Sequence, residues 1–230
     1  MVARGYISGP VTESFAVSLA AGINKRDGFN IDTASASRTN ERDRWFARWQ
    51  GLYDNGSNFS LRLIADYDSI DENCCGAVTL QTSPATAAVL ALGGQVSNPA
   101  TPFANAVFNN FPSTNEVQNY GISAQADYEA GEFTLTSITS YRETKGEFGQ
   151  DVDFTSLDLL QRFQDQKLET FTQEVRLAGE LGPVTMLLGA FYFDETVVEN
   201  QTVNRGARFK NFADLSIGGK RMNDVDPSER

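Results

Sequence analysis

Most of the chain alternates between apolar residues and small or polar residues with a period of two, which is the pattern of β-strands. In the first clear case, Phe15, Val17 and Leu19 share one face while Ser14 and Ser18 lie on the other. The same alternation recurs near residues 2–8, 45–53, 59–67, 120–128, 133–141 and 170–177. Residues 184–194 are apolar on both faces, so the orientation of that segment stays open. The pattern predicts about eight strands, a count that large sheets in proteins commonly reach.

These strands are long and carry aromatic residues near their ends. Most runs cover about 10–13 residues, against roughly 5–6 in ordinary globular proteins and roughly 9–11 for a tilted membrane-spanning strand. The aromatic residues at the strand ends are Phe15, Trp45, Tyr53, Phe59, Tyr67, Tyr120, Tyr128, Phe133 and Tyr141. Two girdles of aromatic residues, one on each side of an aliphatic band, are typical of outer-membrane barrels.

The connections alternate between short and long. Short turns with Gly, Pro or Asn are predicted at residues 9–12, 54–57, 129–132 and 181–183, and long loops at 27–40, 70–116, 146–169 and from 200 onward. In the longest loop, Ser83, Pro84 and Gly93 have the spacing of an N-cap, a first helical position and a helix end. Residues 155–164 are expected to form a second loop helix. Residues 98–112 and those from 218 onward are expected to be irregular.

The predicted fold is therefore all-β: an antiparallel meander of about eight long strands, part of a large transmembrane β-barrel, with a short helix in a long extracellular loop. Such a partial barrel should be an open sheet with two unpaired edges. Greek-key pairing would contradict this architecture.

Composition narrows the function. The 230 residues carry a formal net charge of −11 and contain no histidine. The acidic balance argues against a nucleic-acid partner, and the missing histidine excludes His-based nucleophile systems and histidine metal sites. The adjacent pair Cys74 and Cys75 lacks the spacing of a redox motif, so we expect a disulfide that rigidifies a loop in an oxidising compartment.

Two acidic groups invite catalytic or metal hypotheses. Asp66, Asp68, Asp71 and Glu72 are spaced somewhat like a calcium loop but lack its glycine and distal glutamate. Glu147, Asp151 and Asp153 offer carboxylates for glycoside hydrolysis, although acidic residues are common in polar loops. We expect neither calcium binding nor catalysis: no catalytic residues, no metal site, no cofactor, and a chain that is not an enzyme.

A set of charged residues falls opposite the aromatic-aliphatic face of the strands. A soluble sheet would turn them to solvent, whereas a membrane barrel would turn them into its lumen, because charge on the lipid face costs about 2–4 kcal/mol at the midplane. The lumen-facing candidates are Arg44, Arg48, Arg62, Asp66, Arg142, Glu174 and Arg176.

The chain resembles the middle of a TonB-dependent outer-membrane receptor of the kind abundant in sphingomonads and caulobacters. The resemblance rests on seven segments in the family's order: residues 5–11 (GYISGPV), 24–29 (NKRDGF), 62–67 (RLIADY), 71–76 (DENCCG), 134–142 (TLTSITSYR), 170–178 (TFTQEVRLA) and 187–195 (LLGAFYFDE). Members of this family carry a signal peptide, a TonB box, a plug domain and a barrel of about 22 strands.

The resemblance implies that residues 1–230 are a partial receptor barrel domain, with the signal peptide, plug and C-terminal strands absent from this sequence. It implies the bacterial outer membrane and energised uptake of a scarce nutrient, with a ferric siderophore as the foremost expectation. The implied partners are outer-membrane lipid, the nutrient ligand and, through the missing plug region, the TonB system.

Two other readings stay open. The chain is alternatively a complete small outer-membrane barrel, since eight strands can close. It is alternatively a soluble β-sandwich binding module, which predicts short strands and solubility without detergent.

Overall fold

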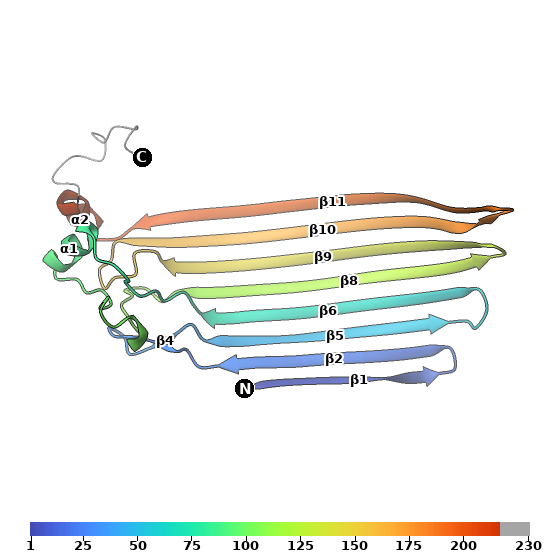
Figure 1. Ribbon diagram of the computed structural model, residues 1–230, viewed down its shortest axis with the longest axis horizontal. Coiled ribbons are helices and arrows are strands. Elements are labelled where there is room, and N and C mark those ends of the chain that lie inside the picture. The colour runs from blue at the N-terminus through green and yellow to red at the C-terminus, as the bar shows by residue number, and fades with distance from the viewer. Residues whose placement is uncertain (217–230) are drawn as a thin grey trace.

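The computed structural model describes residues 1–216, and its main feature is one eight-stranded antiparallel sheet (Figure 1). The strands follow one another in the order β1-β2-β5-β6-β8-β9-β10-β11, so neighbours in the sheet are also consecutive sheet strands along the chain. Their bounds are β1 (Val2–Thr12), β2 (Phe15–Arg26), β5 (Arg42–Asp54), β6 (Phe59–Asn73), β8 (Thr114–Ala130), β9 (Phe133–Asp151), β10 (Leu160–Leu181) and β11 (Val184–Arg205). The predicted antiparallel meander is confirmed.

The strands lengthen across the sheet, from 11 residues in β1 to 22 residues in β10 and β11. The loops expected at residues 146–169 and from 200 onward are therefore partly wrong. Residues 146–151, 160–169 and 200–205 all belong to strands. Most of these residues are polar, and the few apolar ones do not alternate along one face, so the pattern that marks a half-buried strand is missing. Their backbone groups are nevertheless paired, since β10 bonds to β9 on one side and to β11 on the other.

Two tight turns at the end of the sheet away from the loops need glycine. Gly131 and Gly182 have φ of +65° and +61° at the first central position of two-residue hairpin turns, as in type II′ turns. The turn expected at residues 9–12 is wrong, because these residues complete β1 and the chain reverses at residues 13–14. Pro10 fits there because β1 is an edge strand, where no ladder bond needs its missing N–H.

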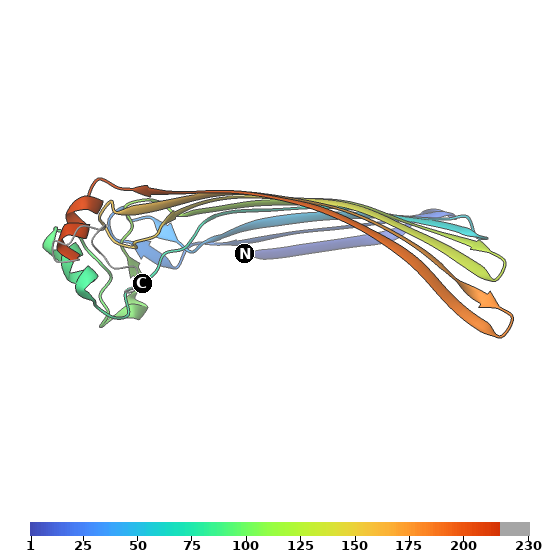
Figure 2. The ribbon, with the colours of Figure 1, turned by 90° about the horizontal axis from the view of Figure 1, so that it is seen from above.

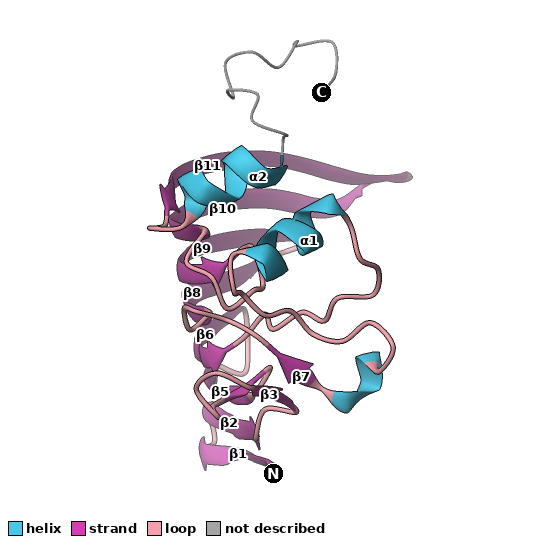
Figure 3. Cartoon of the chain, turned by 90° about the vertical axis from the view of Figure 1, so that its left-hand side faces the viewer, coloured by secondary structure: helices cyan, strands magenta, loops and turns pink. Residues whose placement is uncertain are grey.

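Residues 27–41, 74–113, 152–159 and 206–216 gather at the opposite end of the sheet and form what we call the loop cap. Figures 2 and 3 show the loop cap lying to one side of the sheet. It contains α1 (Pro84–Ala91), α2 (Phe209–Ser216), the 3-10 turn Pro102–Ala104 and the short strands β3 (Asn30–Asp32), β4 (Arg38–Thr39) and β7 (Ala106–Val107). The three short strands form a second sheet in the order β4-β3-β7.

The first expected loop helix is confirmed and the second is wrong. Ser83 caps α1 through a reciprocal capping box with Thr86. Residues 155–164 are not a helix: Asp153 accepts hydrogen bonds from the Thr155 and Leu160 N–H groups at 3.0 and 2.9 Å, and β10 begins at Leu160. A side chain that bonds nearby backbone in this way competes with helix formation. The expectation for residues from 218 onward lies outside the described residues.

The buried apolar residues all belong to the loop cap, among the residues that the structure describes. Val89, Leu157 and Leu159 form a small core, joined by partly buried Leu92, Val96 and Phe212. The eight-stranded sheet adds nothing to this core, and many of its large apolar side chains are exposed, such as Ile122 at 58%. No helix in the described part of the chain has the length and apolarity to cross a membrane.

The register places the apolar side chains of the sheet on one face. In an antiparallel pair, directly opposed residues point to the same side. Leu19, Trp49, Ala65, Ile122, Tyr141 and Phe171 are opposed in this way from β2 to β10. We call this side the Trp49 face: odd-numbered residues of β1, β2, β5, β6, β9 and β10 and even-numbered residues of β8 and β11. The other side is the Arg48 face.

Aromatic residues form two bands on the Trp49 face. Phe15, Tyr53, Phe59, Tyr128 and Phe133 lie toward the short turns; Trp45, Tyr67, Tyr120 and Tyr141 lie toward the loop cap. Ring centroids are 4.9 Å apart for Trp45 and Tyr67 and 6.3 Å apart for Tyr120 and Tyr141. From Tyr128 to Tyr120 is about 27 Å along the strand, or about 20 Å after a tilt of about 40°, comparable with the about 25 Å apolar band of membrane barrels.

Replacing Gly131 by Ala tests the hairpin turn between β8 and β9. A Cβ at φ +65° is strained, so we expect a loss of about 1 kcal/mol in unfolding free energy. Gly5→Ala is the matched control, because a Cβ there meets nothing within 4 Å. Urea titration in detergent measures both. An equal effect of the two substitutions would contradict the assignment of a glycine-dependent turn.

Candidate functional site

All seven charged residues predicted to line a barrel interior lie on the Arg48 face: Arg44, Arg48, Arg62, Asp66, Arg142, Glu174 and Arg176. The structure gives several of them specific partners. One register row runs Arg48–Asp66–Gly121–Arg142 across β5, β6, β8 and β9.

The ion pair between Arg142 and Asp66 crosses an intervening strand. Arg142 donates from Nη2 to both carboxylate oxygens of Asp66, at 2.9 and 2.8 Å. Gly121 lies between them, and a Cβ built on it would come within 2.6 Å of Arg142 Nη2. The missing side chain of Gly121 therefore gives the guanidinium its path over β8.

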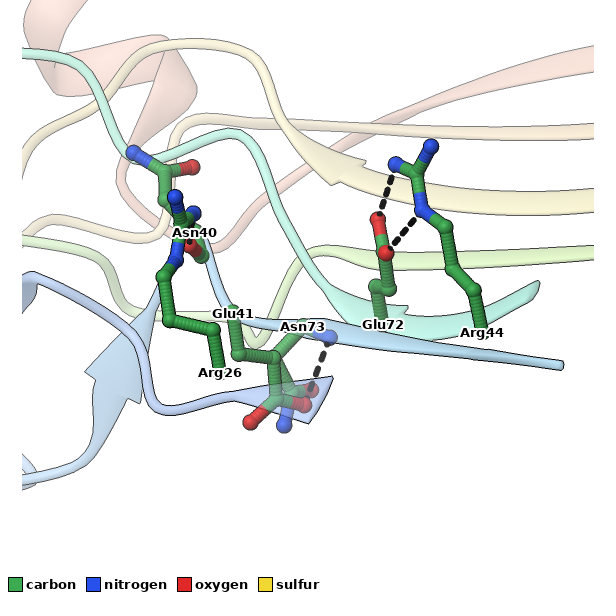
Figure 4. Close-up of polar contacts among 6 residues, drawn as sticks. All are labelled: Arg26, Asn40, Glu41, Arg44, Glu72 and Asn73. Carbon is green, nitrogen blue, oxygen red and sulfur yellow. Dashed lines mark hydrogen bonds and ion pairs between the residues drawn. The ribbon is translucent and has the colours of Figure 1, made fainter. Parts of the chain in front are cut away.

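A second ion pair lies where β5 and β6 reach the loop cap (Figure 4). Arg44 donates from Nη2 to Glu72 Oε2 at 2.8 Å and from Nε to Oε1, while the Glu72 side chain is only 5% exposed. Such bidentate contact fixes both side chains. Nearby, the Arg26 Nη2 group donates to the Asn40 carbonyl oxygen at 2.8 Å, and the Asn73 N–H donates to Glu41 Oε1 at 3.0 Å. These contacts tie the strand ends to the cap.

Of the four other predicted residues, Glu174 and Arg176 form an ion pair, whereas Arg48 and Arg62 are unpaired within the described residues. Arg176 Nε donates to Glu174 Oε1 at 2.5 Å. Arg48 and Arg62 are exposed and have no hydrogen bond or ion pair with residues 1–216.

The cysteine pair lies at the base of the longest loop. Cys74 and Cys75 form a disulfide, and the Cys74 N–H donates to the Ser113 carbonyl oxygen at 2.8 Å. The next carbonyl, that of Gly76, accepts hydrogen bonds from the side chains of Asn30 and Asn40, both at 3.2 Å. This arrangement joins both ends of residues 74–113 to the first cap loop.

Asp151 organises the cap where β9 ends. It is fully buried and accepts hydrogen bonds from the N–H groups of Asn110, Asp153 and Phe154 at 3.0, 3.2 and 3.1 Å. Burial, followed by the negative charge of Asp153, raises the pKa of the Asp151 carboxyl to about 7, and the three N–H groups oppose this rise. Asp151 therefore joins residues 74–113 to residues 152–159 and has a structural role.

The geometry supports neither acidic hypothesis. Asp66 and Glu72 are held by arginines, and Asp68 accepts from Asn119 Nδ2 at 2.8 Å, while Asp71 lies on the opposite face. Glu147 also lies on the Trp49 face, where it is exposed, whereas the carboxylate of Asp151 is buried and bonds to three backbone N–H groups of the cap. No group of three or more Asp, Glu or Cys residues in the described part of the chain is placed to hold a metal ion.

The loop cap contains two cavities that the sequence did not reveal. One, of about 380 Å³, is lined mainly by apolar residues that include Val89, Leu159 and Phe212. The other, of about 290 Å³, is polar, and both Thr39 and Asn109 line it. The Thr39 hydroxyl and the side-chain amide of Asn109 have no hydrogen-bond partner among the described residues. Because their lining residues come from distant segments, no local pattern in the sequence marks these cavities.

Comparisons with known proteins identify the fold. No family model matches the chain, and no curated protein matches it. The ferric yersiniabactin uptake receptor FyuA of Yersinia pestis superimposes with a TM-score of 0.69 at 12% identity, covering 89% of this chain and 30% of the receptor. FpvA of P. aeruginosa, solved with heterologous pyoverdines, gives 0.63 at 14% identity, covering 87% and 26%.

The chain thus spans less than a third of these two proteins, and its fold is that of a section of a TonB-dependent receptor barrel. FyuA is an uptake receptor, and at 12% and 14% identity the two likenesses concern the fold.

A double-mutant cycle tests the path of Arg142 over β8. Gly121→Ala should displace the guanidinium and cost at most about 1 kcal/mol, because the pair is partly exposed. In an Arg142→Ala background the same substitution should cost nothing further, as urea titration would show. Additive effects of the two substitutions would contradict the proposed contact.

Titration of Asp151 tests the electrostatics of the cap. Its pKa is higher in the folded chain than in the unfolded chain, so its favourable contribution to stability is complete below about pH 4 and lost as the pH rises through about 7. The carboxyl ¹³C shift should titrate with a midpoint near 7, and Asp153→Asn should lower that midpoint. A midpoint in the ordinary range for Asp would show that the three N–H groups outweigh burial.

Proposed function

We propose that the chain is part of the barrel wall and external loops of a TonB-dependent outer-membrane receptor that takes up a scarce nutrient, foremost a ferric siderophore. The observation that carries the proposal is the open eight-stranded meander, which superimposes on 30% of one solved uptake receptor and 26% of another. Residues 1–230 would be a partial barrel domain in a bacterial outer membrane. We also expect a source of the sphingomonad or caulobacter kind.

The exposed Trp49 face supports a lipid environment. Its aliphatic band and two aromatic bands have the dimensions of a membrane-spanning belt, and no described element of the chain covers them. In water this surface would far exceed the apolar patches that monomeric soluble proteins leave exposed. The Arg48 face would then be the inner wall, where Arg48 and Arg62 are free to meet a negatively charged ferric complex.

The two competing readings receive less support. A closed eight-stranded barrel needs β1 to pair with β11, but within the described residues β1 pairs with β2 alone and β11 with β10 alone. A β-sandwich needs two packed sheets with a shared core, whereas the buried apolar residues described here lie only in the loop cap. In our proposal, the plug that contacts TonB comes from the rest of a longer receptor.

Transport by the full-length product of the gene tests the proposal. A deletion strain grown without iron should lose uptake of a ⁵⁵Fe-labelled siderophore, and the wild-type gene should restore it only while TonB and the proton gradient are intact. Arg48→Gln/Arg62→Gln should lower uptake of an anionic ferric complex without lowering the amount of protein in the outer membrane.

The matched control is Arg208→Gln/Lys210→Gln, which removes the same charge from α2 and its lead-in and should leave uptake unchanged. Recovery of the protein as a water-soluble monomer without detergent would overturn the membrane assignment. Membrane insertion without TonB-dependent uptake would leave a barrel and overturn the transport proposal.

A further inference from the structure

The polar cavity of the loop cap, of about 290 Å³, is built from three separate segments of the chain. Its lining residues come from residues 32–39, from residues 109–113 and from Asn73 at the end of β6. Pockets for drug-sized ligands have about 300–1,000 Å³, so this cavity fits one small molecule of the size of a single sugar ring. It contains neither Arg48 nor Arg62, and an occupant would therefore be separate from a ferric complex on the Arg48 face.

Two buried side chains that line this cavity have unused hydrogen-bonding groups. Asn109 is only 6% exposed, and neither its Oδ1 nor its Nδ2 atom has a partner among residues 1–216. Thr39 is 5% exposed, and its hydroxyl is likewise unpaired within the described chain. Buried polar groups are nearly always hydrogen-bonded in native proteins, because an unpaired one is destabilising. The two side chains therefore point to a ligand that forms hydrogen bonds with them.

The two charged residues of the cavity are bonded to the cap itself. The Asp32 carboxylate accepts hydrogen bonds from three backbone N–H groups, among them that of Asn109 at 3.2 Å, and from the Ser35 hydroxyl. Arg38 donates from Nη1 to the Gly28 carbonyl oxygen at 3.0 Å. The carboxylate is therefore satisfied by four donors, and together with the guanidinium it leaves the cavity without net charge. The contact with Asp32 also fixes the main chain of Asn109.

An uncharged molecule with several hydroxyl groups complements this arrangement. The Asn109 carboxamide needs one partner atom that accepts from Nδ2 and another that donates to Oδ1. An anion can only accept hydrogen bonds and an ammonium group can only donate them, whereas neighbouring hydroxyls of a sugar do both. Phe111 also lines the cavity, and its ring lies edge-on to that of Phe163, with 5.3 Å between the centroids. Such a fixed ring provides an apolar surface for the C–H groups of a pyranose.

We propose that this cavity binds one pyranose ring of an uncharged carbohydrate. The Asn109 carboxamide exchanges hydrogen bonds with two neighbouring hydroxyls, the Thr39 hydroxyl bonds to a third, and Phe111 contacts the apolar side of the ring. The bound sugar joins residues 27–41 to residues 74–113, because these two cap loops supply the lining. It is a fixed ligand that orders the cap. The inference concerns the loop cap alone and does not rest on the proposed uptake.

Sugar binding to the full-length protein tests the proposal. The protein is purified in an amine-oxide detergent, because glycoside detergents carry a sugar themselves. It is titrated with the methyl glycosides of glucose, mannose and galactose, and binding is measured by saturation-transfer NMR. We expect a methyl glycoside to bind and to raise the unfolding temperature, whereas sodium phosphate should do neither. Asn109→Leu replaces the carboxamide by an apolar group of similar shape and should weaken binding about tenfold.

Gln95→Leu is the matched control for this substitution. Gln95 is exposed, belongs to the same cap and does not line the cavity, so loss of its carboxamide should leave the affinity unchanged. Without sugar, Asn109→Leu should not lower the unfolding temperature, because the amide that it removes has no partner in the described cap. An amide with a purely structural role would lower that temperature when replaced. Circular dichroism of each variant confirms that the sheet is retained.

Absence of binding by all three glycosides, equal binding of phosphate, or unchanged affinity in a folded Asn109→Leu variant would overturn the proposal. So would a crystal structure of the protein soaked in a glycoside that shows only ordered water around Asn109. None of these results bears on TonB-dependent uptake of a ferric complex, so failure of the sugar site is distinguishable from failure of the proposed function.

Discussion

Main-chain hydrogen bonding in the absence of a protein core is the constraint on which this structure depends. Between its two aromatic bands the Trp49 face is mainly apolar, with many large side chains exposed, so in the proposed lipid environment the peptide groups behind it need partners within the sheet. A continuous antiparallel ladder supplies those partners, whereas an irregular segment at the same depth would leave groups unpaired at a cost of several kcal/mol each. Strand length, tight glycine turns and consecutive pairing all follow from this requirement.

Features encoded locally were predictable. The alternation around Trp49, the glycine turns at Gly131 and Gly182 and the Ser83 cap of α1 each depend on a few neighbouring residues, and the structure contains all of them. The extensions of β9 and β10 past the aromatic band were missed, because most of their residues are polar and the few apolar ones do not alternate along one face. Helix propensity also misled at residues 155–164, where the Asp153 side chain takes over backbone hydrogen bonds.

The candidate site shows the same division between local pattern and long-range contact. Parity alone placed Asp66 and Arg142 on one face, but it gave no sign that they pair across β8. That contact depends on Gly121, whose register position is fixed only when three strands are assembled. The polar cavity beside Thr39 and Asn109 likewise brings together residues that are remote in sequence. Chemistry built from distant strands leaves no signature in one sequence.

The two edges of the sheet make different demands on their neighbours. β1 offers 11 residues of unpaired main chain and β11 offers 22, so pairing them with each other would leave half of β11 without partners. Each edge needs a strand of comparable length, because an exposed edge of this size invites aggregation. In a larger barrel, the strands next to β11 would therefore extend far beyond the membrane, whereas the strands next to β1 would end close to it. The loop cap would then rest on the taller side, where α1 and α2 lie near the ends of β10 and β11 (Figure 3).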